Sequence, residues 1–218
     1  MTAREQILGN VRTALKRAAG QPPLSTAAPL PAPTLRIPRS DRSLYTDLFV
    51  QNLEKLAGKA FVVRNSAAVV PALSGLLANK NVVASNAPFL RTCGITGLPQ
   101  VHTGFTDRDE LRAACAGADI GITSVDYALA ATGTFVMIAS PSEARLVSLL
   151  PPAHLAVIPQ SRILANLDEL FSLIPKPADV TSSMVLITGP SRTADIEQIL
   201  VRGVHGPGEV YAVIVEES

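Results

Sequence analysis

From Ser43 onward, short apolar runs alternate with segments of helical periodicity, and this alternation limits the possible folds more than any other feature of the sequence. The apolar runs predict strands at residues 61–63, 82–84, 100–102, 118–123, 134–139, 155–158, 184–188 and 210–215. The periodic segments predict helices at residues 44–56, 66–78, 87–93, 107–116, 142–150, 161–174 and 194–202. Continuous apolar strands between helices are typical of parallel sheets that are buried on both faces. We therefore predict an α/β fold with a mostly parallel sheet covered by helices on both faces.

Two further segments precede this region. Residues 2–18 have the pattern of an amphipathic helix, in which Thr2 and Glu5 fit a capping box. Its apolar face consists of Ile7, Leu8, Val11 and Leu15. Residues 20–40 contain six prolines and predict a semi-rigid or disordered linker. The predicted organisation is thus an N-terminal helix (1–19), a linker (20–42) and an α/β domain (43–218). The helix either docks on its own domain or packs on another chain, and the linker favours the second alternative.

Composition excludes several classes of protein. The chain has 218 residues, of which 47% are hydrophobic and 17% charged, as in a globular protein with a sizeable core. A formal net charge of +1 gives no electrostatic reason to expect nucleic acid or an anionic membrane as a partner. No apolar run approaches the ~20 residues of a membrane span, and the N-terminus lacks the apolar core of a signal peptide. We therefore expect a cytoplasmic protein.

Motifs for common cofactors are missing from the sequence. The two cysteines, Cys93 and Cys115, lie far apart, which excludes a disulfide framework and an iron–sulfur cluster held by cysteines of this chain alone. The three histidines, His102, His154 and His205, lack the close spacing of a metal site and are expected to be structural. The sequence has no phosphate-binding loop, dinucleotide fingerprint or nucleophile elbow. We expect no metal and no cofactor in this chain.

The segment 185–208 predicts an anion site. An apolar run, Val185–Ile187, is followed by the small-residue loop 188–193 and then by the predicted helix 194–202. A strand, a loop and a helix start in this order present backbone N–H groups and a helix dipole to an anion. Ser191 or Thr193 can cap the helix, and Arg192 can bind an anion through two hydrogen bonds. The alternative is that Ser191 is only a cap and Arg192 only a surface charge.

Other polar residues follow or precede predicted strands. Ser124 and Asp126 come after the strand 118–123, and Arg145 comes soon after the strand 134–139. Ligands of open α/β sheets bind beyond the carboxyl ends of the strands. The predicted ligand-binding residues are Ser124, Asp126, Thr132, Gly133, Thr134, Arg145, Thr188, Gly189, Ser191, Arg192 and Thr193. The alternatives are a helix cap for Asp126, a simple turn for residues 132–134 and a solvent-facing side chain for Arg145.

Two ordered blocks of the sequence resemble the lactate utilisation protein C family, also called the LUD domain family. One block is TGPSRTADIE followed by GVHGPGEV, within residues 188–210. The other comprises Gly121–Thr123, Asp126-Tyr127, the AATGT of residues 130–134 and the RLVSLLPPAH of residues 145–154. The resemblance covers about residues 43–216. Ala131 stands where the family pattern has Glu, so a role that needs this carboxylate does not carry over.

The resemblance implies a fold like that of ribose-5-phosphate isomerase, glucosamine-6-phosphate deaminase and CoA transferases. It also implies a role in the oxidation of L-lactate to pyruvate, with iron–sulfur clusters on partner oxidoreductase subunits. The first hypothesis is an accessory subunit that binds a small anionic metabolite. The alternatives are a free-standing isomerase- or CoA-transferase-like enzyme, or a regulatory module, acting on a phosphorylated or CoA-linked metabolite. The sequence leaves the three open.

Overall fold

The structure is a computed structural model that describes residues 2–16, 18, 42–193 and 201–216. The chain forms two compact units, one of which contains helix α1 (Ala3–Ala14) and the other all remaining elements. The predicted capping box of α1 is confirmed, because Thr2 and Glu5 each accept a hydrogen bond from the other's backbone N–H. None of the residues of α1 is buried, and Ile7 and Leu15 are more than half exposed. The predicted linker lies outside the described residues, apart from Arg42 at the start of the next helix.

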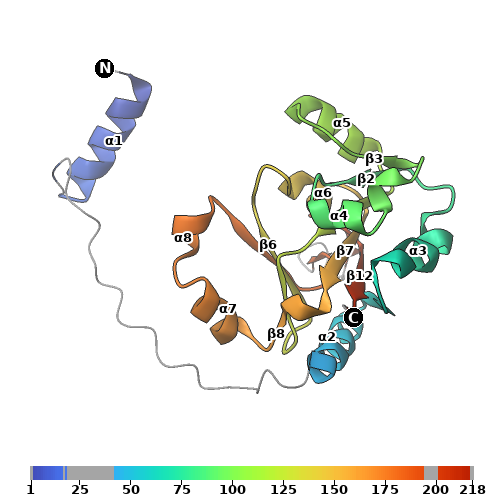
Figure 1. The fold of residues 1–218 in the computed structure, drawn as a ribbon. Helices are drawn as coiled ribbons and strands as arrows, with labels where there is room; N and C mark the ends of the chain where they lie inside the picture. Colours follow the sequence, from blue (N-terminus) through green and yellow to red (C-terminus); the bar gives the residue numbers. More distant parts are fainter. Residues whose placement is uncertain (1, 17, 19–41, 194–200, 217–218) are drawn as a thin grey trace. The chain divides into compact units, whose positions relative to one another are not determined.

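Six parallel strands form the central sheet of the larger unit (Figure 1). They are β1 (Lys59–Val63), β2 (Val82–Ala84), β3 (Val101–His102), β4 (Ile120–Ser124), β7 (Ala153–Pro159) and β12 (Glu209–Val215), in the order β1-β12-β7-β4-β2-β3. Every pair of neighbours is parallel. All residues of β2 and β7 are buried, and all except His154 are apolar, as expected for strands covered on both faces. The predicted parallel sheet is thus confirmed.

The helices begin largely where the sequence indicates. They are α2 (Arg42–Lys55), α3 (Val69–Leu77), α4 (Pro88–Thr92), α5 (Arg108–Gly117), α6 (Arg145–Leu149), α7 (Leu167–Leu173) and α8 (Pro177–Val180), with 3₁₀ turns η1 (Ser66–Ala68), η2 (Ile95–Gly97) and η3 (Gln160–Arg162). The Asp107 carboxylate accepts from two backbone N–H groups at the start of α5, and the Asn166 side chain accepts from one at the start of α7. These caps fix both helix starts.

A second, mixed sheet was not predicted. It contains β8 (Ile163–Leu164), β5 (Tyr127–Leu129), β6 (Thr134–Ile138) and β9 (Met184–Ile187), in that order. β6 is antiparallel to both of its neighbours, β5 and β9. The predicted helix 161–174 is wrong in its first half, because η3 and β8 occupy it and β8 pairs with β5. α7 begins only after the Asn166 cap.

The predicted helix 194–202 is wrong at its end. Val201–Arg202 form strand β11, which pairs antiparallel with β10 (Arg192–Thr193). Residues 194–200 of this prediction lie outside the described residues. Thr193 is therefore part of a strand pair.

Different elements pack on the two faces of the central sheet. One face packs on α3 and α4, through residues such as Leu73, Leu90 and Leu155. The other packs on α2 and the inner face of the second sheet, including Phe49 and Phe135, and on α5 and α6 near β2. α7 covers the outer face of the second sheet (Figure 1). Helices thus lie on both faces as predicted, and the second sheet adds to the cover of one.

Candidate functional site

The carboxyl ends of β2 and β4 meet at the buried side chain of Glu143. Its Oε1 accepts a hydrogen bond from the Ser85 hydroxyl at 2.8 Å and from the Ser124 backbone N–H at 2.9 Å. Ser85 directly follows β2, and Ser124 ends the neighbouring strand β4. The loop before α6 holds Glu143 in place, since Asn86 N–H donates to the carbonyl of Ser142 at 3.0 Å. Glu143 is only 7% exposed.

Burial changes the acidity of this carboxyl. It raises the pKa of Glu143 to about 7, although the hydrogen bonds from Ser85 and Ser124 act in the opposite direction. The negative charge of Asp126 adds to the rise. Oε2 has no hydrogen-bond partner among the described residues, and Oε1 already accepts two, so the proton of the neutral form belongs on Oε2. Glu143 can therefore gain or lose a proton near neutral pH.

Asp126 lies beside this group, between β4 and β5. Its Oδ2 accepts from the backbone N–H of Ile138 at 2.7 Å, and its own N–H donates to the carbonyl of Val136 at 3.0 Å. Burial raises the pKa of Asp126, and the hydrogen bond from Ile138 and the charge of Arg162 offset this only in part. Because Asp126 precedes a strand, the alternative of a helix cap is wrong. Its carboxylate secures the end of β6.

A pocket of about 240 Å³ lies against Ser85. Its polar lining comes from the end of β2, the loop before α5 and the loop before α6, namely Ser85, Asn86, Thr106, Asp107, Arg108 and Ser142. The Asn86 side chain fixes one wall, because it donates to the carbonyl of Phe105 and accepts from the N–H of Gly104, both at 2.8 Å. Ser85 lines this pocket and donates to Glu143, which is itself not among the lining residues.

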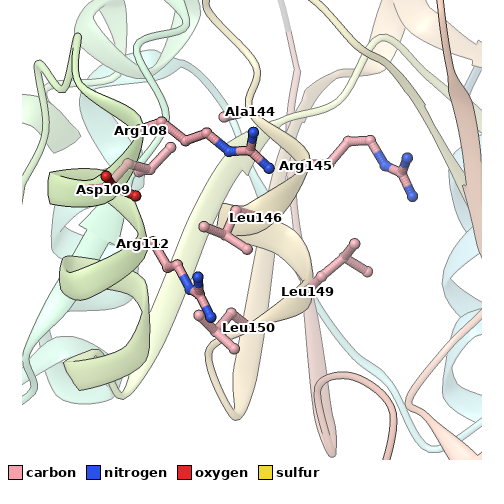
Figure 2. Close-up of a pocket in the computed structure, with 9 residues that line it drawn as sticks. Arg108, Asp109, Arg112, Ala144, Arg145, Leu146, Leu149 and Leu150 are labelled. Carbon is pink, nitrogen blue, oxygen red and sulfur yellow. The ribbon is translucent and has the colours of Figure 1, made fainter. Parts of the chain in front are cut away.

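A second, larger hollow lies against α5 and α6, and Arg145 is among its lining residues, with its side chain pointing away from α5 (Figure 2). This hollow of about 830 Å³ is lined by three arginines, Arg108, Arg112 and Arg145, together with Asp109 and several leucines. Arg145 is exposed, as the solvent-facing alternative states. α6 can approach β4 closely because residue 121 is glycine, where a Cβ would lie 1.9 Å from the carbonyl oxygen of Val147.

The predicted residues from the AATGT turn and the loop after β9 gather around the end of α2. The hydroxyls of Thr132 and Thr134 lie 2.7 Å apart, and those of Thr134 and Thr188 lie 2.8 Å apart. Gly133 has a positive φ of 63°, and a Cβ there would lie 2.5 Å from the backbone nitrogen of Leu53. Gly133 thus forms a packed junction with α2, and the hydroxyls of Thr132, Thr134 and Thr188 form a hydrogen-bonded chain next to it, in which Thr132 and Thr188 are exposed.

The next residues continue this junction. Gly189 lies against Leu56, and the Arg192 guanidinium donates to the carbonyl of Leu56 just beyond α2. A cation near helical carbonyls is stabilised by the helix dipole. Ser191 forms two hydrogen bonds with the turn before β12. Its N–H donates to the carbonyl of Pro207 at 2.8 Å, and its Oγ accepts from the N–H of His205 at 3.4 Å. Thr193 pairs with Val201.

The structure does not bring the predicted ligand-binding residues into one pocket. Asp126 bonds to Ile138 at one end of β6, whereas Thr134 and Thr188 lie at the other end. Four residues of a strand separate these ends, which corresponds to about 13 Å. Ser124 and Asp126 lie with Glu143, Arg145 lies in the arginine hollow, and the remaining residues lie at the junction with α2. Their roles in ligand binding stay predictions.

Glu143 was missed in the sequence. The signal was present, because a carboxylate follows the predicted strand 134–139 within the small-residue loop Ser140-Pro141-Ser142. His154 lies fully buried beneath Phe135, with Nε2 2.8 Å from the Thr123 hydroxyl. Burial lowers the pKa of His154 to about 4, so it is neutral near pH 7 and fits a structural role.

Among residues 2–16, 18, 42–193 and 201–216, no group of three or more His, Cys, Asp or Glu side chains is arranged to hold a metal ion. No helix within these same ranges is long and apolar enough to span a bilayer.

Comparison with known proteins identifies relatives. A family model described as LUD domain matches residues 46–215. A protein named lactate utilization protein C from Halalkalibacterium halodurans is 36% identical over 146 residues, which cover 63% of this chain and 64% of that protein. One of the same name from Anoxybacillus flavithermus is 33% identical over 165 residues, covering 72% of this chain and 74% of the relative. The chain thus spans less than two thirds of the Halalkalibacterium protein.

A solved structure shares the fold. The crystal structure of a DUF162 family protein from Deinococcus radiodurans superposes with a TM-score of 0.62 at 19% identity. The superposition covers 80% of this chain and 98% of that protein. At this identity the likeness concerns the fold alone.

Proposed function

The chain belongs to the LUD domain family, and we propose that it serves the utilisation of lactate as an accessory subunit that binds a small carboxylate metabolite. The names of the relatives support the pathway. The observation that carries the binding role is Glu143, a buried carboxyl at the carboxyl ends of β2 and β4, beside a pocket of about 240 Å³. This is where ligands of open α/β sheets bind.

The pocket offers suitable partners for a hydroxy acid or keto acid. Arg108 can bind a carboxylate through two parallel hydrogen bonds, and the Ser142 hydroxyl can donate or accept. The Ser85 hydroxyl donates to Glu143, so it can accept from the hydroxyl of a ligand. A negative ligand near Glu143 favours the neutral form of its carboxyl. Binding is therefore expected to raise the pKa of Glu143 and to take up protons near pH 7.

We place the electron carriers on partner subunits. Oxidation of L-lactate to pyruvate releases two electrons and two protons, so an acceptor is required. The two cysteines of this chain are buried in different clusters, Cys93 on the α4 side of the central sheet and Cys115 on the inner side of α5. Burial raises the pKa of both thiols to about 11, which disfavours the thiolate that a cluster iron needs. Iron–sulfur oxidoreductase subunits are the proposed partners.

One observation favours a second function, that of an enzyme in its own right. An isomerase- or CoA-transferase-like reaction on a phosphorylated or CoA-linked metabolite needs a carboxylate base or nucleophile. Ala131 supplies none, but Glu143 is a carboxylate with a pKa near neutrality. Turnover of such a metabolite by the purified chain alone would support this alternative.

Growth on L-lactate tests the first function. A strain that lacks the gene should fail to grow on L-lactate and should recover with the wild-type gene. Ser142→Leu, which fills the pocket, should restore little growth, whereas Ser74→Leu, at an exposed position of α3, should restore it fully. Normal growth of the deletion strain on L-lactate would refute a role in lactate utilisation.

The purified chain provides a second test. It should contain no iron and should not reduce a dye with L-lactate unless an iron–sulfur subunit is added. Lactate-dependent dye reduction by the pure chain would contradict the accessory role.

A further inference from the structure

The hollow between α5 and α6 combines positive charge with exposed leucine side chains (Figure 2). We propose that this surface docks an acidic, amphipathic segment of a different protein. We call it the arginine–leucine face and define it by Arg108, Arg112, Arg145, Leu146, Leu149 and Leu150. The inference goes beyond the proposed function, because it rests on the charge and shape of this face and not on lactate.

The positive charge of the face is largely uncompensated. All three arginines are exposed, and among the described residues none of them forms an ion pair within 4.0 Å. Asp109 is the one acidic residue in the lining. Guanidinium groups held close together repel one another, and a surface of one sign attracts a partner of the opposite sign. Charge complementarity therefore calls for a partner with several carboxylates.

Leucine side chains form the apolar part of the face. Leu150 is 43% exposed, and Leu146 and Leu149 are partly exposed on the same short helix. Leu146 also packs against the buried residues Val147 and Cys115, so its position is fixed. Interfaces between proteins commonly have an apolar centre with a polar rim in which arginine is enriched. The partner segment should therefore place apolar side chains between its carboxylates.

The arrangement of the arginines does not favour one small anion. In Figure 2 the three guanidinium groups point in different directions and do not converge on one point. The hollow, at about 830 Å³, is also far larger than the pocket beside Ser85. α5 and α6 border the hollow, so an amphipathic helix that lies across them can contact both, as in the helix-in-groove mode of recognition.

The N-terminal helix of a second copy is a poor candidate for the occupant. Within residues 2–16 this helix region carries Arg4, Arg12 and Lys16 against Glu5, a net charge of +2. Arginines of the face would repel it. The occupant is therefore a segment of a different protein, with Leu, Ile or Val at helical spacing and Glu or Asp on the flanks.

Synthetic peptides test this inference with the full-length protein. The main probe is a fluorescein-labelled helical peptide of about 18 residues, or five turns, with a leucine stripe flanked by glutamates. One matched peptide has Gln for every Glu, and another has Ser for every Leu. Fluorescence anisotropy should show binding of the main peptide and at least ~10-fold weaker binding of each matched peptide, since charge and apolar contacts both contribute.

Charge reversal locates the binding site. Arg112→Glu and Arg145→Glu should each weaken binding of the main peptide at least ~10-fold, since an attractive contact becomes repulsive. Arg91→Glu, an exposed arginine of α4 on the other side of the central sheet, should change it less than about twofold. Circular dichroism melts verify that the variants fold, as expected for exposed positions.

Several results would overturn the proposal. One is the absence of binding of the main peptide at concentrations up to about 1 mM. The others are equal affinity for the main peptide and the Gln peptide, or an equal loss of peptide affinity in the Arg91→Glu and Arg112→Glu variants. Displacement of the peptide by inorganic phosphate at a few millimolar, with ionic strength held constant, would instead indicate a small-anion site and would also overturn it.

Discussion

Replacing Glu143 with Gln should remove a pH-dependent loss of folding stability. Gln keeps an oxygen that can accept from Ser85 and Ser124, and its NH₂ group replaces the neutral O–H at Oε2. Unlike Glu, it cannot ionise. The variant therefore imitates the protonated wild type at every pH.

The size of the effect follows from the pKa shift. Burial raises the pKa of Glu143 from 4.5 to about 7, so the unfolded chain loses this proton at lower pH than the folded one. The contribution of Glu143 to the free energy of unfolding therefore falls as pH rises from 4.5 through 7, and the destabilisation is complete above pH 7. A shift of about 2.5 pKa units corresponds to roughly 3 kcal/mol. Glu143→Gln should match the wild type near pH 4.5 and exceed it by up to about 3 kcal/mol at pH 8.

Urea unfolding followed by circular dichroism between pH 5 and 8 measures this difference. Other titrating groups, such as His154, largely cancel when the variant is subtracted from the wild type. Glu110→Gln, at an exposed position of α5, serves as the matched control and should show no such trend. A difference that does not change with pH, or a variant that is less stable than the wild type at pH 8, would refute the assignment of a raised pKa to Glu143.

Three further predictions concern stability. Gly133→Ala should lower the free energy of unfolding by about 2–4 kcal/mol, because φ is positive there and the new Cβ would meet Leu53. Gly75→Ala in α3, which has open space around it, should not lower this free energy, and equal effects of the two substitutions in urea unfolding would contradict the prediction. His154→Leu should gain stability relative to the wild type as pH falls from about 6.5 towards 4, since burial lowers the pKa of His154 and only the unfolded wild-type chain takes up the proton there. A difference between the two proteins that does not change with pH would refute it. Deletion of residues 1–40 should change the midpoint temperature of thermal unfolding by less than about 2 °C, because α1 buries no residue. A large fall in this temperature would contradict the prediction and show that α1 belongs to the core.

The sequence predicted the central sheet well because its strands must be apolar on both sides. β2, β7 and β12 lie between layers, and their unbroken apolar runs follow directly from that position. β5 and β8 have three and two residues, too short to show a pattern, and they exist through pairing with each other and with β6. β8 lies far from β5 in the sequence, so this pairing cannot be inferred from local composition.

The candidate site was predicted only where the parallel-sheet rule applies. Ser124 and Asp126 follow β4, a strand of the central sheet, and they lie at the site. The loop after β9 was placed by the same rule, but β9 runs antiparallel to β6, so its carboxyl end lies at the start of β6. The position of Glu143 in the loop after the predicted strand 134–139 was visible in the sequence, but its burial was not, because the burial depends on this loop folding back onto two strands.

Calorimetric titration with L-lactate tests the central claim most directly, namely that a small carboxylate binds beside Glu143 and promotes its protonation. The wild type is titrated at pH 7.5 in HEPES and in Tris, whose ionisation enthalpies differ and neither of which supplies a phosphate that could compete for Arg108. The observed heats should differ between the buffers by an amount that corresponds to uptake of about half a proton, and Glu143→Gln should bind with equal heats in both. Absence of binding up to about 10 mM L-lactate, or equal heats for the wild type in the two buffers, would contradict the account.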